Sequence, residues 1–121
     1  SNDLRDIEAA ADAGNDDAAN AILSYAYSIK KYIGAYAAAM GGLDAVVFAG
    51  GIGTNSPTVR ALSLAGLELL GIRLDGEKNR HAFPGRDISI DDSPVRIFVV
   101  ETNEELTVAR KAAALLRSVG K

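Results

Sequence analysis

The chain has 121 residues, of which 48% are hydrophobic and 24% are charged, and its formal net charge is −3. This length and composition predict one domain that can bury a core. The small net charge, without a run of lysine or arginine, argues against nucleic acid or a membrane surface as partner. The chain has no cysteine and one histidine, which excludes a disulfide framework and a thiolate or multi-histidine metal centre.

The composition also indicates where the protein works. The absence of cysteine suits a reducing cytosol, so we expect a cytoplasmic protein. Polar residues and glycines interrupt the apolar stretches well short of a membrane span. Residues 1–3 have the features of neither a signal peptide nor an initiator methionine, so we expect the start to be internal or processed.

Two helices are predicted in the first third of the chain. Residues 6–13 are alanine-rich, begin with acids and stop at Gly14, which is typical of a short helix that Asp3 could cap. Residues 15–17 open a second helix that ends at Gly41 and Gly42. Apolar residues recur along it at steps of three and four, which predicts one face for the core or for an interface. These residues are Ile22, Ala26, Ile29, Ile33, Tyr36, Ala37 and Met40.

The central stretch runs from an apolar segment, residues 45–49, through three glycines to a helix start. The apolar segment predicts a buried parallel strand. Ser56 can cap the following helix, and Pro57 suits its first position. A strand, a glycine loop and a helix together favour phosphate binding. The alternative is that the glycines serve only the close packing of strand and helix.

The spacing of the glycines limits which nucleotide-binding motifs the loop can match. Gly51 and Gly53 match the dinucleotide fingerprint, but Ser56 stands at its third glycine. No lysine lies where a P-loop requires one, which excludes that motif. Asp75 has the distance expected of a ribose-binding acid, although no convincing strand precedes it. A dinucleotide-dependent oxidoreductase module therefore stays as an alternative.

The remaining residues complete an α/β pattern. The helix that begins at Pro57 is the third one predicted, with Gly71 as its C-terminal cap. Its predicted buried stripe consists of Val59, Leu62, Gly66, Leu69 and Leu70. Residues 72–93 are less regular, with a turn at Asp75 and Gly76 and a half-exposed strand at 87–91. Residues 95–100 predict a second central strand, and a last helix follows. Its first turn has capping-box spacing between Thr102 and Glu105, which leaves Glu104 without a local role.

Several of these stretches resemble acetate kinases. The sequence VFAGGIGTNS at residues 47–56 is similar to the glycine-rich nucleotide loop of that family. DLRD at 3–6, KKYIGAYAAAMGGLD at 30–44, GLELLGI at 66–72 and TNEEL at 102–106 agree in order and spacing. The resemblance runs the whole length of the chain but matches about the final third of a typical member. We therefore expect a carboxy-terminal portion.

The resemblance implies a fold as well. Acetate kinases belong to the superfamily of actin, sugar kinases and heat-shock chaperones, which has two ribonuclease H-like domains. Residues 1–121 would be the distal, nucleotide-binding part of the second domain, with parallel strands flanked by helices. Members typically dimerise through this domain, so a homodimer is expected.

The resemblance further implies reversible phosphoryl transfer between ATP and acetate, which gives acetyl phosphate and ADP and requires Mg²⁺. A related propionate kinase and a non-catalytic assembly fragment are the alternatives. The family's catalytic arginines, aspartate and acetate pocket come from segments before Ser1, so no catalytic residue is assigned here and the chain is expected to be inactive alone. The family usually has glutamate at the position of Thr54. The resemblance assigns nucleotide contacts to Asp3, Leu4, Arg5, Gly51, Ile52, Gly53, Thr54 and Asn55, and Mg²⁺ to Glu104.

Overall fold

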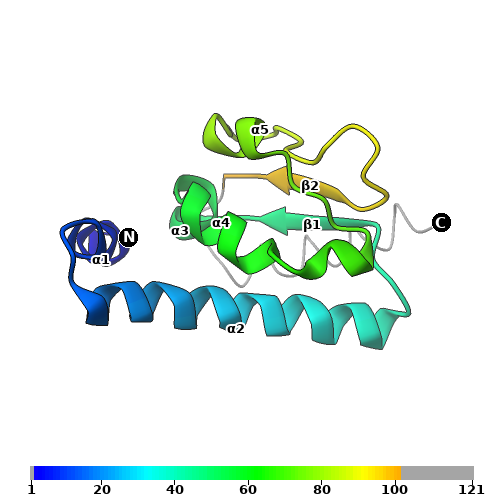
Figure 1. The fold of residues 1–121 in the computed structure, drawn as a ribbon. Coiled ribbons are helices and arrows are strands. Elements are labelled where there is room, and N and C mark those ends of the chain that lie inside the picture. Colours follow the sequence, from blue (N-terminus) through cyan, green and yellow to red (C-terminus); the bar gives the residue numbers. More distant parts are fainter. Residues whose placement is uncertain (1, 102–121) are drawn as a thin grey trace.

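The computed structural model describes residues 2–101, without the side chains of residues 2–4, 51, 52 and 54. A long helix lies under a pair of strands, and shorter helices flank them (Figure 1). This arrangement confirms the predicted α/β class. The elements in order are α1 (Asn2–Asp12), α2 (Asp16–Met40), β1 (Ala45–Phe48), α3 (Gly50–Asn55), α4 (Pro57–Leu64), the 3-10 helix η1 (Leu67–Leu70), α5 (Gly76–Arg80) and β2 (Arg96–Val99).

The ends of α2 follow the local chemistry that the sequence predicted. Asn15 precedes the helix with an extended backbone, and its side-chain oxygen accepts a hydrogen bond of 3.0 Å from the N–H of Ala18. At the other end Gly41 has a φ of 75°, the left-handed conformation of a C-terminal cap. The first helix begins earlier than predicted, at Asn2, so Asp3 lies inside α1 instead of before it.

The predicted apolar face of α2 is only partly buried. Ile22, Ala26, Ile33 and Ala37 are buried, as expected. Tyr36 is 48% exposed because it lies about 100° around the helix from Ala37. Met40, in the last turn, is 42% exposed. The core-facing stripe is therefore narrower than predicted.

The two strands form a parallel pair, which confirms the prediction for both. Ala45 pairs with Arg96 and Phe48 with Val99, so the carboxyl ends of β1 and β2 lie side by side. The N–H of Val100 donates to the carbonyl of Phe48 at 2.8 Å and closes this end. Around the pair is the hydrophobic core, formed by Ile33, Val46, Phe48, Leu64, Leu67, Ile72, Ile88, Val95, Ile97 and Val99.

The third helix was predicted to be continuous, and this prediction is wrong. It breaks after Leu64, because Gly66 has a φ of 87° and cannot continue a right-handed helix. The 3-10 helix η1 follows and ends at Gly71, whose φ of 84° is that of the predicted left-handed cap. Leu69 was predicted to be buried, but the change of helix type leaves it 83% exposed to solvent.

Residues 72–93 are more ordered than the sequence predicted. Asp75 caps α5, with its carboxylate accepting a bond of 3.0 Å from the N–H of Lys78, where only a turn was expected. Residues 85–88 lie antiparallel to β2: the N–H of Ile88 donates to the carbonyl of Ile97 at 2.7 Å. This pairing covers an edge of β2 that the sequence left open.

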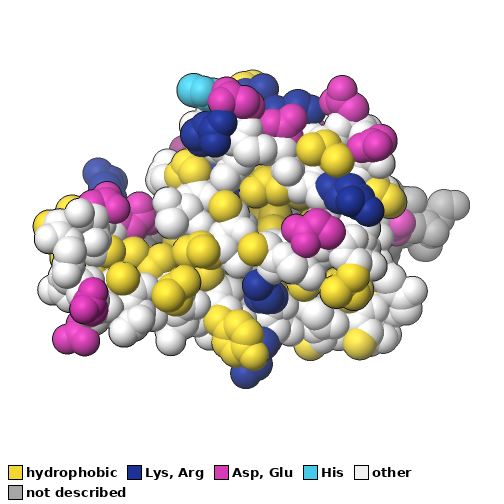
Figure 2. Space-filling model, viewed as in Figure 1, with side chains coloured by type: hydrophobic (Ala, Val, Ile, Leu, Met, Phe, Trp, Pro, Cys, Tyr) yellow, Lys and Arg dark blue, Asp and Glu magenta, His cyan; other side chains and the backbone are white. Residues whose placement is uncertain are grey.

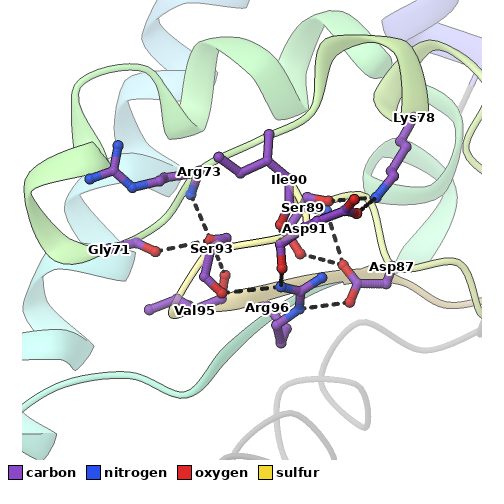
Figure 3. A network of polar contacts seen from close by, with 10 residues as sticks. All are labelled: Gly71, Arg73, Lys78, Asp87, Ser89, Ile90, Asp91, Ser93, Val95 and Arg96. Atoms are coloured by element: carbon purple, nitrogen blue, oxygen red, sulfur yellow. Dashed lines mark hydrogen bonds and ion pairs between the residues drawn. The ribbon is translucent and has the colours of Figure 1, made fainter.

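Arg96 organises the loop between this segment and β2 (Figure 3). Its Nε donates to the Asp87 carboxylate at 2.8 Å, and its Nη1 donates to the carbonyls of Ile90, Asp91 and Ser93. Burial alone would raise the pKa of the Asp87 carboxyl, but hydrogen bonds from Ser89 and the charge of Arg96 hold that pKa below its usual value. We call these residues the outer arginine network.

The surface differs between the two sides of the molecule. Charged side chains gather over α5, whereas hydrophobic side chains are visible over α1, α2 and α4 (Figure 2). Leu23 and Tyr27 of α2 are 51% and 60% exposed. Within residues 2–101, no helix has the length and apolar character needed to cross a bilayer.

Candidate functional site

The glycine segment leaves the carboxyl end of β1 as predicted, but it is not a loop. Gly50 turns the chain with a φ of 75°, and residues Gly50–Asn55 then form the short helix α3. Glycine is a poor helix former, so this helix depends on contacts from outside the segment. The predicted order of strand, glycine loop and helix is corrected to strand, glycine-rich helix and helix.

Gly53 lies against the end of the strand. A Cβ atom on Gly53 would sit 3.3 Å from the carbonyl carbon of Phe48, closer than side chains normally approach a backbone. The position is half-buried. The packing here is tighter than a side chain normally allows, which supports the packing alternative at Gly53 without excluding a ligand at the segment.

Ser56 joins the glycine segment to α1. Its hydroxyl oxygen accepts from the N–H of Val59 at 3.1 Å and so caps α4, as predicted. The same hydroxyl donates to the carboxylate of Glu8 at 2.6 Å. Because Glu8 lies in α1, the helix that carries Asp3, Leu4 and Arg5 is tied to the end of the segment of residues 51–55. The two predicted nucleotide-contacting segments are thus connected.

A buried arginine holds the other side of the glycine segment. Arg60 of α4 is 1% exposed, and its Nη1 donates to the carbonyl of Gly53 at 2.8 Å. Its Nε and Nη2 donate to the side-chain and backbone oxygens of Asn79, at 2.7 and 2.9 Å. The amide nitrogen of Asn79 donates in turn to the carbonyl of Pro57 at 2.9 Å. We call these residues the Arg60 clamp.

The electrostatics of the clamp follow from its depth. Burial lowers the pKa of the Arg60 guanidinium from its usual value. An arginine side chain nevertheless keeps its proton in proteins, so the clamp holds a buried positive charge. Such a charge is tolerated only where hydrogen bonds replace its water, as Gly53 and Asn79 do here.

Sequence reasoning missed Arg60 and Asn79. An arginine in a helix and an asparagine in a polar run usually face solvent, so neither residue stands out in the sequence. One signal could have found Arg60: it stands one helical turn before the buried Leu64, on the same side of α4.

The structure does not describe the residue that was predicted to bind a metal ion. Glu104 and the capping box of Thr102 and Glu105 lie outside the described residues. Among the side chains that the structure describes, no three from His, Cys, Asp or Glu come close enough together to hold a metal ion. The described part of the chain shows only that β2, which leads toward Glu104, ends beside the strand that leads into the glycine segment.

Fold and site together define an α/β protein with a glycine-rich segment at the carboxyl end of a parallel strand, the place where ligands gather in open sheets. The model of the acetokinase family matches residues 1–110. The chain therefore belongs to the acetokinase family.

Individual relatives agree with this assignment. The chain is 47% identical over 121 residues to an acetate kinase of Methanosarcina barkeri, a match that covers 100% of the chain and 30% of that protein. It is 50% identical over 120 residues to an acetate kinase of Caldanaerobacter subterraneus subsp. tengcongensis, covering 98% of the chain and 30% of the relative. The chain thus spans about 30% of the length of these relatives.

Solved structures agree as well. The crystal structure of Porphyromonas gingivalis acetate kinase superposes with a TM-score of 0.80 at 44% identity, over 96% of the chain and 29% of that structure. A propionate kinase from Francisella tularensis superposes with a TM-score of 0.74 at 32% identity, over 92% of the chain and 28% of that structure. The likeness thus extends to enzymes named for two different carboxylates.

Proposed function

We propose that the full-length protein containing this chain transfers the terminal phosphoryl group of ATP to acetate, reversibly, to give acetyl phosphate and ADP. Residues 1–121 would be its carboxy-terminal, nucleotide-binding portion. The observation that carries the proposal is the 44% identity and TM-score of 0.80 with an acetate kinase over nearly the whole chain. The position of the glycine segment at the end of β1 supports it.

The proposed nucleotide contacts fall on two segments. Residues 51–55 would meet the nucleotide mainly through the backbone, because two of the five are glycines and Thr54 replaces the family's usual glutamate. Asp3, Leu4 and Arg5 would lie on the adenosine side. The hydrogen bond between Glu8 and Ser56 supports a shared site, since it ties the helix of the second set to the end of the first.

The role proposed for the chain is to bind and orient the nucleotide. Phosphoryl transfer depends mostly on positioning and on stabilising charge, so a complete site also needs cationic groups around the transferred group. We assign no such group to this chain and expect residues 1–121 alone to be inactive. Mg²⁺, proposed at Glu104, would neutralise phosphate charge when bound. The described side chains provide no ligand cluster for the ion, so no step is assigned to it.

The acceptor could instead be propionate. The likeness to the Francisella tularensis propionate kinase favours this second candidate. Acetate is preferred because the matching relatives with higher identity are named acetate kinases. Rates of acyl phosphate formation by the full-length protein with acetate and with propionate, trapped as hydroxamates, separate the two. A clear preference for propionate would replace our proposal.

A role in assembly is a further alternative, and the exposed tyrosines of α2 favour it. Tyr27 and Tyr32 are 60% and 68% exposed, and the rings of Tyr32 and Tyr36 lie 5.8 Å apart. Exposed aromatic side chains of this kind are common at interfaces. We propose that the full-length protein is a cytoplasmic homodimer, which light scattering and fractionation would test.

Nucleotide binding distinguishes the enzyme from its alternatives. Titration calorimetry of the full-length protein should show binding of ADP and none of NAD. Binding of NAD in preference to ADP would favour the dinucleotide module, and binding of neither would favour the assembly fragment.

A further inference from the structure

We propose that Arg60 is a positioning residue of the nucleotide site: it fixes the glycine segment through the carbonyl of Gly53, and Asn79 holds Arg60 in place. The inference rests on the proposed function, because it concerns how the proposed nucleotide segment keeps its shape. It assigns a role to two side chains that the resemblance did not single out.

The first step is the carbonyl of Gly53. In a continuing α-helix this oxygen would accept from the N–H four residues later, but that residue is Pro57, which has no N–H. The guanidinium of Arg60 supplies the missing donor at 2.8 Å. Arg60 therefore joins α3 to α4 across the position where proline interrupts the backbone ladder.

The second step is the flexibility of the segment. Glycine residues lose more conformational freedom on folding than any others, so a glycine-rich helix needs restraints from outside. Phe48 packs closely on one side, since a Cβ atom on Gly53 would lie only 3.3 Å from its carbonyl carbon. Arg60 holds the carbonyl of the same residue. Gly53 is thus fixed from two directions before any ligand arrives, which lowers the entropy lost on binding.

The third step concerns the residue that holds the side chain of Arg60 in place. Asn79 accepts from Nε of Arg60 through its side-chain oxygen and donates through its amide nitrogen to the carbonyl of Pro57. Both ends of the amide are occupied, which sets the direction of the guanidinium. Because Asn79 belongs to α5, this helix takes part in shaping the glycine segment although it lies apart from it in sequence.

Arg60→Lys in the full-length protein is the direct test. A lysine can donate to one carbonyl but cannot bridge Gly53 and Asn79 as the planar guanidinium does. We expect the dissociation constant of ADP and the KM of ATP to rise about tenfold or more, because small misplacements of binding groups are costly. The KM of the carboxylate should stay the same. Asn79→Ala should also raise the dissociation constant of ADP and the KM of ATP. This variant replaces Arg60→Lys in the test if Arg60→Lys does not fold.

Arg96→Lys is the matched control. Arg96 also donates to several backbone carbonyls, but none of them lies in the glycine segment. This variant should lower the melting temperature and leave ADP affinity unchanged when measured well below melting. Loss of ADP affinity in a folded Arg96→Lys protein equal to that of Arg60→Lys would overturn the proposal, as would unchanged ADP affinity in folded Arg60→Lys and Asn79→Ala proteins.

A second readout separates this inference from the proposed function. Without nucleotide, hydrogen exchange of the amides of residues 51–56 should be faster in Arg60→Lys than in the wild type and in Arg96→Lys. If the wild-type protein fails to bind ADP, the proposed function fails, and with it the positioning role. Unchanged exchange in Arg60→Lys, with ADP binding intact in the wild type, would overturn the positioning role alone.

Discussion

The Arg60 clamp and the outer arginine network place the same side chain on similar acceptors at different depths. Arg60 is 1% exposed and donates to Gly53 and Asn79, whereas the side chain of Arg96 is 31% exposed and donates to Asp87 and three loop carbonyls. Water can replace part of the outer contacts if they are lost, but it has much less access to the acceptors around the buried Arg60. Depth therefore makes the inner arginine more sensitive to substitution, and only Arg60 contacts the glycine segment.

Replacement of each arginine by leucine should show the largest contrast. Arg60→Leu leaves the oxygens of Gly53 and Asn79 without this donor. It should lower the free energy of unfolding by about 3–5 kcal/mol, because each buried acceptor that loses its partner costs about 1–3 kcal/mol. Arg96→Leu should cost about 1–2 kcal/mol, because its partners can turn to water. Urea denaturation measures both values. Equal losses would show that depth does not govern the two networks.

Gly53→Val tests the glycine segment from the side of the strand. The added side chain meets the backbone at Phe48, and overpacking of this kind should lower stability by about 1–3 kcal/mol. If the glycines serve phosphate binding alone, as the strand, glycine loop and helix favoured, the loss of nucleotide binding should be far greater than the loss of stability. The structure predicts that both fall. Denaturation and ADP titration of the same variant decide between these expectations. Gly34→Ala tests for a general effect of replacing glycine, because no atom lies within 4 Å of the added Cβ and the φ of Gly34 is not positive.

Substitutions at Ser56 and Asn15 compare a buried helix cap with an exposed one. Ser56 caps α4 and also donates to Glu8, so its loss should lower stability by about 1–2 kcal/mol. Asn15→Ala removes a cap whose hydrogen bond is exposed and should cost about 0.5–1 kcal/mol. Thermal melting measures the difference. A greater cost for Asn15 would argue against the tie between α1 and the glycine segment.

Acid should weaken the outer network. Because the folded pKa of Asp87 is lowered, the contribution of its carboxylate is fully present above about pH 4, the ordinary aspartate pKa, and is lost as pH falls through the folded value. Asp87→Asn should cost about 1 kcal/mol at pH 7 and less at pH 2. Asp91→Asn, at an almost fully exposed carboxylate paired with Lys78, should change little at either pH. A constant difference between wild type and Asp87→Asn would contradict this assignment.

The sequence predicted best what local chemistry decides. Asn15, Ser56 and Gly41 act as caps in the structure because a cap needs only its own side chain or φ and the nearby backbone. The parallel pairing of β1 with β2 was predictable because both are short apolar segments that enter helical patterns. The family could be identified from the glycine segment and four further stretches.

What the sequence missed depends on contacts between distant residues. The bond between Ser56 and Glu8 joins positions 48 residues apart, and no local pattern indicates it. The helical form of residues 50–55 runs against glycine propensity and coincides with restraints from Phe48 and Arg60. In the candidate site, sequence located the glycine segment but not the side chains that hold it.

The account's central claim is that nucleotide binds at the glycine segment. Hydrogen exchange of the full-length protein, with and without saturating ADP, tests this directly by peptide. We predict slower exchange in residues 51–56 and at the start of α1, and no change in residues 87–93 of the outer loop. Slower exchange elsewhere, with residues 51–56 unchanged by bound ADP, would contradict the claim.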